Sequence, residues 1–397
     1  MSLIYLDNNA TTKVAPEVLE AMLPYFKEEY ANPSSVYEFA KRSNHAVRDA
    51  RGVLKDFFNA KDEKEIIFTS CGSESANTGI RGVLNMNKNK RHIITTKVEH
   101  PCVLNLYRAL EKEGYRVDYI GVNSNGELDL AQLEEAICDD TALVSVMYAN
   151  NETGVVFPIK KISEIIKSKN PQTKFYVDAV QVTGKLAIDV QDLGVDMMGI
   201  SGHKFHAPKG IGALYVNSKT LITPLIIGGH QERGKRAGTE NVPYIVGMAK
   251  AAELATDALK YETTEIKRLR DKLEQNIVKN VFNSRINAGI LNRVPNTTNI
   301  GFEYIEGELM LLHLSDLGIC ASSGSACTSG SLEPSHVLRA MNVPFTAVHG
   351  SIRFSLSRYT TEKEIDYVCE QMPKIIEKLV KISPFQDELE ALRKLRQ

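Results

Sequence analysis

Residues 195–204 read VDMMGISGHK and place Lys204 directly after an apolar run, with a second apolar run at 210–216. Two short apolar runs separated by a glycine-containing turn are typical of buried strands, so Lys204 is predicted to lie at a strand end. Lysines at such positions are mostly solvated or paired with acids. A lysine that is partly buried instead loses its proton more easily, and its neutral amine can form a Schiff base with an aldehyde.

A second motif, FYVDAVQ at 175–181, supports this interpretation of Lys204. It reads as a buried strand that ends in polar residues, among them Asp178 and Gln181. An aspartate there could cap its own turn, which is usual after a strand. It could also pair with the protonated ring nitrogen of pyridoxal phosphate, and Gln181 could then reach the ring hydroxyl.

Composition limits the kind of protein this can be. The chain has 397 residues, 43% of them hydrophobic, which is long enough for one large and one small core. A net charge of -1 argues against nucleic acid or anionic membranes as partners. We find no signal peptide or membrane-spanning run in the sequence, so we expect a cytoplasmic protein.

Helical and strand patterns alternate up to residue 217, which predicts an α/β large domain with a mostly parallel, doubly wound sheet. A long helix is expected over 244–281. Strands at 296–302, 319–322 and 351–357 then alternate with helices at 306–317 and 361–381, as in a smaller α+β domain. We assign residues 15–260 to the large domain, and residues 1–14 with 261–397 to the small domain.

The six cysteines show no C-x-x-C spacing and no closely spaced histidines, which argues against zinc ribbons and redox dithiols. Five of them lie in or beside apolar segments and are predicted to be small buried thiols, namely Cys71, Cys102, Cys138, Cys320 and Cys369. The sixth, Cys327, lies in the serine- and glycine-rich stretch 322–335. That composition predicts an exposed loop with an accessible thiol, although such a cysteine can also be incidental.

Two further turns follow predicted strands. Gly72 and Ser73 open a helix after the strand at 66–68, where free backbone N–H groups could bind phosphate or the hydroxyls could simply cap the helix. His100 precedes Pro101 at the start of another helix. It could cap that helix, or it could face the same sheet edge as Lys204, where ligands gather in such sheets.

These motifs together resemble the cysteine desulfurases of the NifS/IscS group, which are fold-type I pyridoxal phosphate enzymes. The resemblance runs from YLDNNATT at 5–12, through DAVQ at 178–181 and SGHK at 201–204, to RFSLS at 353–357. Its most specific part is SSGSACTSG at 322–330. It implies an enzyme that converts L-cysteine to L-alanine through an aldimine with pyridoxal phosphate.

The resemblance also implies a role for each reacting residue. Lys204 would hold the cofactor and take the α-proton, Asp178 would keep the ring nitrogen protonated, and His100 would cover the ring and exchange protons with substrate. Cys327 would attack the substrate sulfur and store it as a persulfide for an iron-sulfur scaffold protein. Arg353 would clamp the substrate carboxylate, and Asn32 would approach the substrate.

The remaining implied contacts concern cofactor binding and assembly. Gly72 and Ser73 would bind the phosphate, although the family commonly has threonine in place of Ser73. Ser201 and His203 would add phosphate contacts, and Asn151 would contact the cofactor. The protein would be a homodimer in which Thr239 reaches the partner's cofactor phosphate. No intrinsic metal is implied, only a transient iron-sulfur ligand role for Cys327 with the scaffold.

Two other functions are compatible with parts of this pattern. An aminotransferase or a selenocysteine lyase would use Lys204 and Asp178 in the same way, but neither needs the long Cys327 loop. A sulfur-carrier module without catalysis would need Cys327 and leave Lys204 idle. A visible absorbance band from the bound cofactor separates the carrier from the enzymes.

Overall fold

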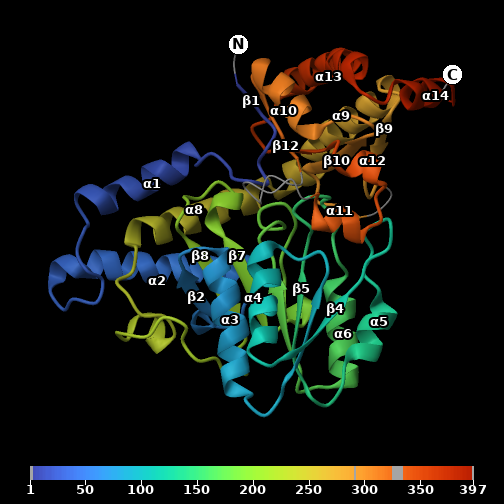
Figure 1. The fold of residues 1–397 in the computed structure, drawn as a ribbon. Coiled ribbons are helices and arrows are strands. Elements are labelled where there is room, and N and C mark those ends of the chain that lie inside the picture. Colours follow the sequence, from blue (N-terminus) through green and yellow to red (C-terminus); the bar gives the residue numbers. More distant parts are fainter. Residues whose placement is uncertain (1–2, 290–291, 324–333, 396–397) are drawn as a thin grey trace.

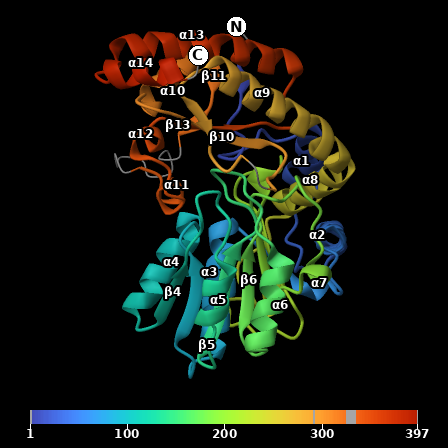
Figure 2. The same ribbon diagram turned by 90° about the vertical axis from the view of Figure 1, so that its right-hand side faces the viewer.

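The computed structural model describes residues 3–289, 292–323 and 334–395. Figure 1 shows two parts, a larger one built on a central sheet and a smaller one above it that holds both termini. The long helix α8 lies beside the larger sheet and leads toward the smaller part (Figures 1 and 2).

A seven-stranded sheet in the order β2-β8-β7-β6-β5-β3-β4 forms the centre of the larger part. Only β8 runs against its neighbours, so the prediction of a mostly parallel sheet is confirmed. The strands are β2 (Ile66–Thr69), β3 (His92–Thr96), β4 (Arg116–Ile120), β5 (Thr141–Met147), β6 (Lys174–Asp178), β7 (Met197–Ser201) and β8 (Gly212–Val216).

Alternate residues of these strands enter two different cores. In β6, Tyr176 packs into one core and Phe175 and Val177 into the other, and in β7 Met197 and Met198 divide in the same way. Since successive side chains of a strand point to opposite faces, both faces of this sheet are covered by helices. Figure 2 shows α4 and α6 on opposite sides of β6.

One face is covered by α3 (Gly72–Met86) and α4 (Pro101–Lys112). The helices of the other face are α1 (Pro16–Lys27), α2 (Glu38–Phe58), α5 (Leu130–Ala136), α6 (Ile159–Lys169), α7 (Val190–Leu193) and α8 (Val242–Tyr261). Three short 3-10 turns connect elements of this part: η1 (Glu63–Glu65), η2 (Gly202–Lys204) and η3 (Gln231–Gly234).

The smaller part contains an antiparallel sheet in the order β12-β13-β10-β9. Beside it, the N-terminal strand β1 (Ile4–Tyr5) pairs in parallel with β11 (Ile319–Cys320), so the first residues of the chain belong to this part. The other strands are β9 (Ser284–Ile286), β10 (Thr297–Phe302), β12 (Ser322–Ser323) and β13 (Ser351–Ser355). The single strand expected over 319–322 is thus two short strands that pair with different partners.

In the part of the chain that the structure describes, six α-helices follow α8. They are α9 (Lys267–Asn280), α10 (Gly307–Asp316), α11 (His336–Ala340), α12 (Phe345–Val348), α13 (Glu362–Ile382) and α14 (Gln386–Leu395). Residues of α9, α10 and α13 share one apolar core with β10 and β13. Val337 and Leu338 of α11 instead pack into the core of the large sheet, which ties this helix to that sheet.

The helix predicted over 244–281 is continuous but contains a π-helical turn, η4 (Glu262–Ile266), between α8 and α9. The domain boundary that we propose at residue 260 falls inside this helix. Among the described residues, no helix combines the length and apolar character needed to cross a membrane.

Candidate active site

The carboxyl ends of β3, β5, β6 and β7 meet at one edge of the large sheet, because these strands run parallel. His100 follows β3, Asn151 follows β5, Asp178 ends β6, and Ser201 ends β7. Lys204 follows three residues after Ser201, in η2. The structure therefore brings together residues that are far apart in the sequence, at the edge where such sheets bind ligands.

Lys204 is half-buried and lies against the N-terminal segment of the chain. Its Nζ donates hydrogen bonds to the backbone oxygens of Asn9, at 2.7 Å, and Ala10, at 2.8 Å. The tight turn before it requires Gly202, where an added Cβ would lie 2.7 Å from Cγ2 of Ile211. The amine is therefore held by backbone carbonyls of the N-terminal segment.

Asp178 lies 6% exposed at the end of β6, and its Oδ1 accepts a hydrogen bond from the backbone N of Val180 at 2.9 Å. Burial raises the pKa of this carboxyl to about 6, although the Val180 hydrogen bond and the charge of Lys204 act in the opposite direction. Such a carboxyl is suited to bind a cationic ring nitrogen, which would compensate the cost of burying its charge.

His100 caps helix α4, since its Nδ1 accepts from the backbone N of Cys102 at 3.2 Å. Burial first, and then the charges of Lys204 and His336, lower the pKa of the imidazole to about 4. The ring is therefore neutral at pH 7, and because Nδ1 accepts a hydrogen bond, its proton lies on Nε2. The capping and active-site interpretations of His100 are compatible in this arrangement.

Gly72 and Ser73 begin α3 beside these residues. A Cβ at Gly72 would lie 3.0 Å from Cγ2 of Val180 and 3.5 Å from Cβ of Ser201, so the helix start approaches the ends of β6 and β7 closely. Ser73 is exposed, and its side chain hydrogen-bonds to the thiol of Cys102. The free N–H groups of this helix start suit an anion.

Ser201 and His203 flank the Lys204 turn. Ser201 is buried at 3% exposure, and Nδ1 of His203 lies 3.1 Å from the hydroxyl oxygen of Thr11. Burial and the charge of Lys204 lower the pKa of His203 to about 4, so its ring is neutral at pH 7. The N-terminal segment thus contacts both Lys204 and His203.

Arg353 in β13 reaches the site from the smaller part. It is 3% exposed, and its guanidinium donates to the Asn151 backbone oxygen at 3.0 Å and to Oδ1 of Asp7 at 2.7 Å. Within the described ranges its Nε has no hydrogen-bond partner. The guanidinium therefore retains a buried donor for a further acceptor such as a carboxylate.

Gln181 joins this cluster, but two other predicted residues do not. Nε2 of Gln181 donates to the Asn9 backbone oxygen at 3.1 Å, the same oxygen that Lys204 contacts. Asn32 is exposed in the α1–α2 connection, which Figure 1 shows at the far left, and its Oδ1 accepts from the backbone N of Ser34. Thr239 is exposed in the connection between η3 and α8. Cys327 lies outside the described residues.

Sequence reasoning missed four buried polar residues that complete the site: Asn9, Glu99, Glu152 and Lys185. Burial raises the pKa of Glu99, the neighbour of His100, to about 8 and that of Glu152, the neighbour of Asn151, to about 7. The only signal in the sequence was their position next to a predicted strand-end turn, which does not distinguish a buried acid from an exposed one.

The prediction that five cysteines are buried is largely wrong. Cys369 alone of the five is buried, Cys71, Cys102 and Cys320 are half-buried, and Cys138 is exposed. Cys138 lies in the turn before β5, where the apolar run has not yet begun. Partial burial raises its pKa, but hydrogen bonds from Thr141, the Asp140 backbone and Arg116 outweigh that effect, so the net pKa is lowered.

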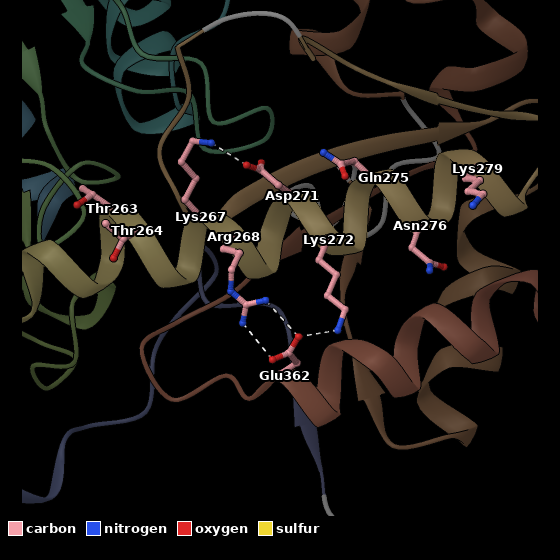
Figure 3. Close-up of a pocket in the computed structure, with 10 residues that line it drawn as sticks. All are labelled: Thr263, Thr264, Lys267, Arg268, Asp271, Lys272, Gln275, Asn276, Lys279 and Glu362. Atoms are coloured by element: carbon pink, nitrogen blue, oxygen red, sulfur yellow. Dashed lines mark hydrogen bonds and ion pairs between the residues drawn. The ribbon is translucent and has the colours of Figure 1, made fainter.

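A groove of about 760 Å³ lies elsewhere, along the exposed side of α9 (Figure 3). Three of its cations are paired within the groove, since both Arg268 and Lys272 contact Glu362, and Lys267 contacts Asp271. We therefore assign it no site. No group of three or more metal-ligating side chains with suitable geometry occurs in the described part of the chain.

Comparison with known proteins gives one family match, two sequence relatives and one similar solved structure. Residues 4–368 match the family model Aminotransferase class-V. The chain is 57% identical over 388 residues to a cysteine desulfurase of Nostoc sp., with 98% of this chain and 96% of that protein covered. It is 50% identical over 385 residues to the cysteine desulfurase NifS of Azotobacter vinelandii, with 97% and 95% covered. A solved NifS-like protein aligns with a TM-score of 0.90 and 39% identity, over 95% of this chain and 100% of that chain.

Proposed function

The chain belongs to the aminotransferase class-V family as an enzyme of the cysteine desulfurase type, and on that premise we propose that it converts L-cysteine to L-alanine with pyridoxal phosphate. The observation that carries this proposal is the meeting of Lys204, Asp178 and His100 at one sheet edge. A lysine, a buried carboxyl and a neutral imidazole at one place are what this cofactor's chemistry requires of a protein.

The residues present fit the cofactor. Asp178 is a buried carboxyl whose raised pKa indicates that its charge lacks compensation, as expected of a partner for a pyridinium nitrogen. The start of α3 offers backbone N–H groups to a phosphate, and the close approach at Gly72 excludes a side chain that would fill that space. Ser73, Ser201, His203 and Asn151 would add the remaining contacts.

When bound, pyridoxal phosphate supplies an aldehyde for an amine and a ring that accepts electrons from the substrate's α-carbon. Lys204 would hold the cofactor, and once the substrate amine has displaced it, its Nζ would take the α-proton and later return a proton to the product. Asp178 would keep the ring nitrogen charged. Arg353 would bind the substrate carboxylate through its guanidinium, in which Nε is still available.

His100 would handle the proton of the substrate thiol. Since its Nδ1 caps α4, proton transfer would run through Nε2, the end that carries the proton in the neutral ring. The Cys327 thiolate would attack the substrate sulfur and keep it as a persulfide, while the Cβ–S bond breaks and its electron pair stays with Cβ, which takes a proton to become the methyl group of alanine. An iron-sulfur scaffold protein would then receive the sulfur. The cysteines of the described residues are free thiols, in accord with a reducing, cytoplasmic compartment.

Reduction with borohydride followed by mass spectrometry tests the central residue. We expect the pyridoxyl group on Lys204 in the digest, because only the lysine that forms the Schiff base gives a reducible link. Lys185 is a demanding control, since it is a second buried lysine whose pKa is lowered, to about 7. An adduct on Lys185, or none at all, would contradict the proposal.

The sulfur-transfer step needs its own test. Replacement of Cys327 by alanine should leave the spectral response to L-cysteine intact and reduce alanine release by far more than ~10²-fold, because the nucleophile is lost. Cys138→Ala, at the exposed thiol of lowered pKa, is the matched control and should retain activity. Labelled sulfur from L-cysteine should be recovered on the Cys327 peptide and not on the Cys138 peptide.

The homodimer is tested through Thr239, which lies exposed where a partner could reach it. If each cofactor site takes Thr239 from the other chain, mixing Thr239→Ala chains with Lys204→Ala chains should restore part of the activity, since one hybrid site carries neither change. A monomer by light scattering at micromolar concentration would exclude this arrangement.

A further inference from the structure

Lys185 is a fully buried lysine that the proposed mechanism does not use. Its Nζ donates to the backbone oxygen of Gln181 at 3.0 Å and to the side-chain Oε1 of Gln181 at 3.1 Å, and it lies 3.5 Å from Oδ1 of Asn9. Burying an ammonium group costs free energy unless its N–H groups are hydrogen-bonded or its charge is paired. A buried lysine therefore calls for an account of what its contacts achieve. Two of these contacts are to Gln181, one to its backbone oxygen and one to its side-chain amide oxygen.

These contacts decide which end of the Gln181 amide faces which neighbour. The two ends of a glutamine amide have nearly the same shape, and only hydrogen-bond partners distinguish the oxygen from the nitrogen. As an ammonium, Lys185 can only donate, and as a neutral amine its two N–H groups serve the two Gln181 oxygens, so the end beside it is Oε1. The opposite end, Nε2, donates to the Asn9 backbone oxygen, which also accepts from Lys204 Nζ.

The consequence is local to the active site. Because Gln181 Nε2 and Lys204 Nζ share one acceptor, the two nitrogens are neighbours. An amide nitrogen has two hydrogens, and one of them is bound by Asn9, so the other remains available to an acceptor near Lys204. If the amide were reversed, it would present a carbonyl oxygen there, which would repel an anionic oxygen.

We propose that Lys185 is a positioning residue that orients the Gln181 amide so that its N–H, and not its carbonyl, faces Lys204 and the ring oxygen of the bound cofactor. This rests on the proposed function, because it concerns the cofactor held by Lys204. Lys185 would not touch the cofactor itself and would act only through Gln181.

The surroundings of Lys185 are consistent with either charge state. Burial is the main cause of its lowered pKa, with the charges of Lys204 and Arg353 acting in the same direction and Glu262 opposing them. Glu262 is itself paired with Arg358. Neutral or charged, the amine has at least two N–H donors, which suffice for the two oxygens of Gln181.

The test is the pH midpoint of the visible absorption band of the holoprotein, a readout that does not depend on turnover. Loss of an N–H donor to the ring oxygen leaves more negative charge on that oxygen, so a proton held beside it is released at higher pH. We expect Lys185→Met to raise the midpoint by roughly one pH unit, the equivalent of one net hydrogen bond. Lys167→Met, a lysine paired at the opposite sheet edge, is the matched control and should leave the midpoint unchanged.

Removal of the Lys185 charge could also raise the midpoint directly, and a double-mutant cycle separates the two effects. If Lys185 acts through the amide, the shift should be largely absent when Lys185→Met is made in a Gln181→Ala background. An equal shift in both backgrounds, or no shift in the single variant, would overturn the proposal. If Lys185→Met does not fold, Lys185→Leu provides the same comparison.

Failure of this inference can be distinguished from failure of the proposed function. A holoprotein without a visible band, or with its reduced adduct away from Lys204, would contradict the proposed function itself. A normal band and a Lys204 adduct, together with a midpoint insensitive to Lys185, would contradict only the role of Lys185.

Discussion

Two buried aspartates at opposite edges of the large sheet have opposite surroundings. Asp196, at the amino end of β7, accepts from Lys167 Nζ at 2.7 Å and Lys174 Nζ at 3.2 Å, and also from the backbone N of Phe175. Asp178, at the carboxyl end of the adjacent strand, accepts from the backbone N of Val180. Lys204, whose charge acts on Asp178, donates instead to backbone oxygens.

The difference separates a structural charge from one kept for a ligand. Asp196 closes a network of ion pairs that joins three segments of the chain, so its charge is already compensated. Burial raises the pKa of Asp178 to about 6, and in the proposed function the bound cofactor would compensate its charge. The structure buries Asp196 at 9% exposure.

The largest contrast is expected between two lysines. Lys204→Ala should reduce alanine formation from L-cysteine by more than ~10³-fold, because both the cofactor link and the proton-transfer amine are lost. Lys174 pairs with Asp196 at the opposite edge of the sheet, so the folded fraction of Lys174→Ala should retain activity. Steady-state assays normalised to folded protein measure the activity of both variants. Similar losses of activity in the two variants would contradict the assignment of catalysis to the carboxyl edge of the sheet.

The two aspartates should differ next. Asp178→Asn should lower activity by roughly 10²-fold or more, since a neutral amide cannot hold a charged ring nitrogen. Asp196→Asn removes the acceptor of two ammonium groups and should instead lower the free energy of unfolding by about 1–3 kcal/mol. Activity assays and urea unfolding of both variants test this, and a reversed pattern would contradict it.

The cysteines at the two edges should react at different rates. Cys138, at the amino edge, is exposed with a lowered pKa, whereas burial raises the pKa of Cys102, at the carboxyl edge. Because the thiolate is the reacting form, iodoacetamide at pH 7.5 should alkylate Cys138 at least about tenfold faster. Peptide mass spectrometry over time measures both sites, and equal rates would show that the two environments do not differ.

The smallest expected effect is a gain in the stability of the apoprotein when Asp178 is replaced. The folded pKa of Asp178, about 6, exceeds its ordinary value of 3.8, so the folded state binds more protons between these values. The contribution of Asp178 to stability is therefore present below pH 3.8 and lost as the pH rises through 6. Asp178→Asn should raise the free energy of unfolding of the apoprotein at pH 7 by about 1–2 kcal/mol. Urea unfolding at pH 7 and pH 4 measures this free energy for both proteins. The prediction is contradicted if Asp178→Asn is no more stable than the unchanged protein at pH 7.

The sequence by itself determined the sheet class and the local position of most site residues. Apolar runs ending in polar turns located β6 and β7, and with them Asp178 and Lys204, because strand burial and turn chemistry are local properties. The π-helical turn inside the long helix and the division of 319–322 into two strands were not visible, since they depend on packing against distant segments.

Only the tertiary structure decided what surrounds each polar residue. Asn9 lies in a segment that sequence periodicity leaves unassigned, yet its backbone oxygen accepts from Lys204 and Gln181, and its amide contacts Thr297 in the smaller part. Lys185 and Asp196 look like ordinary charged residues in sequence, but one is aimed at an active-site amide and the other closes an ion-pair network. The partners of Asn9 lie more than a hundred positions away in the sequence, and those of Asp196 lie 22 and 29 positions away, so no local pattern could specify these contacts.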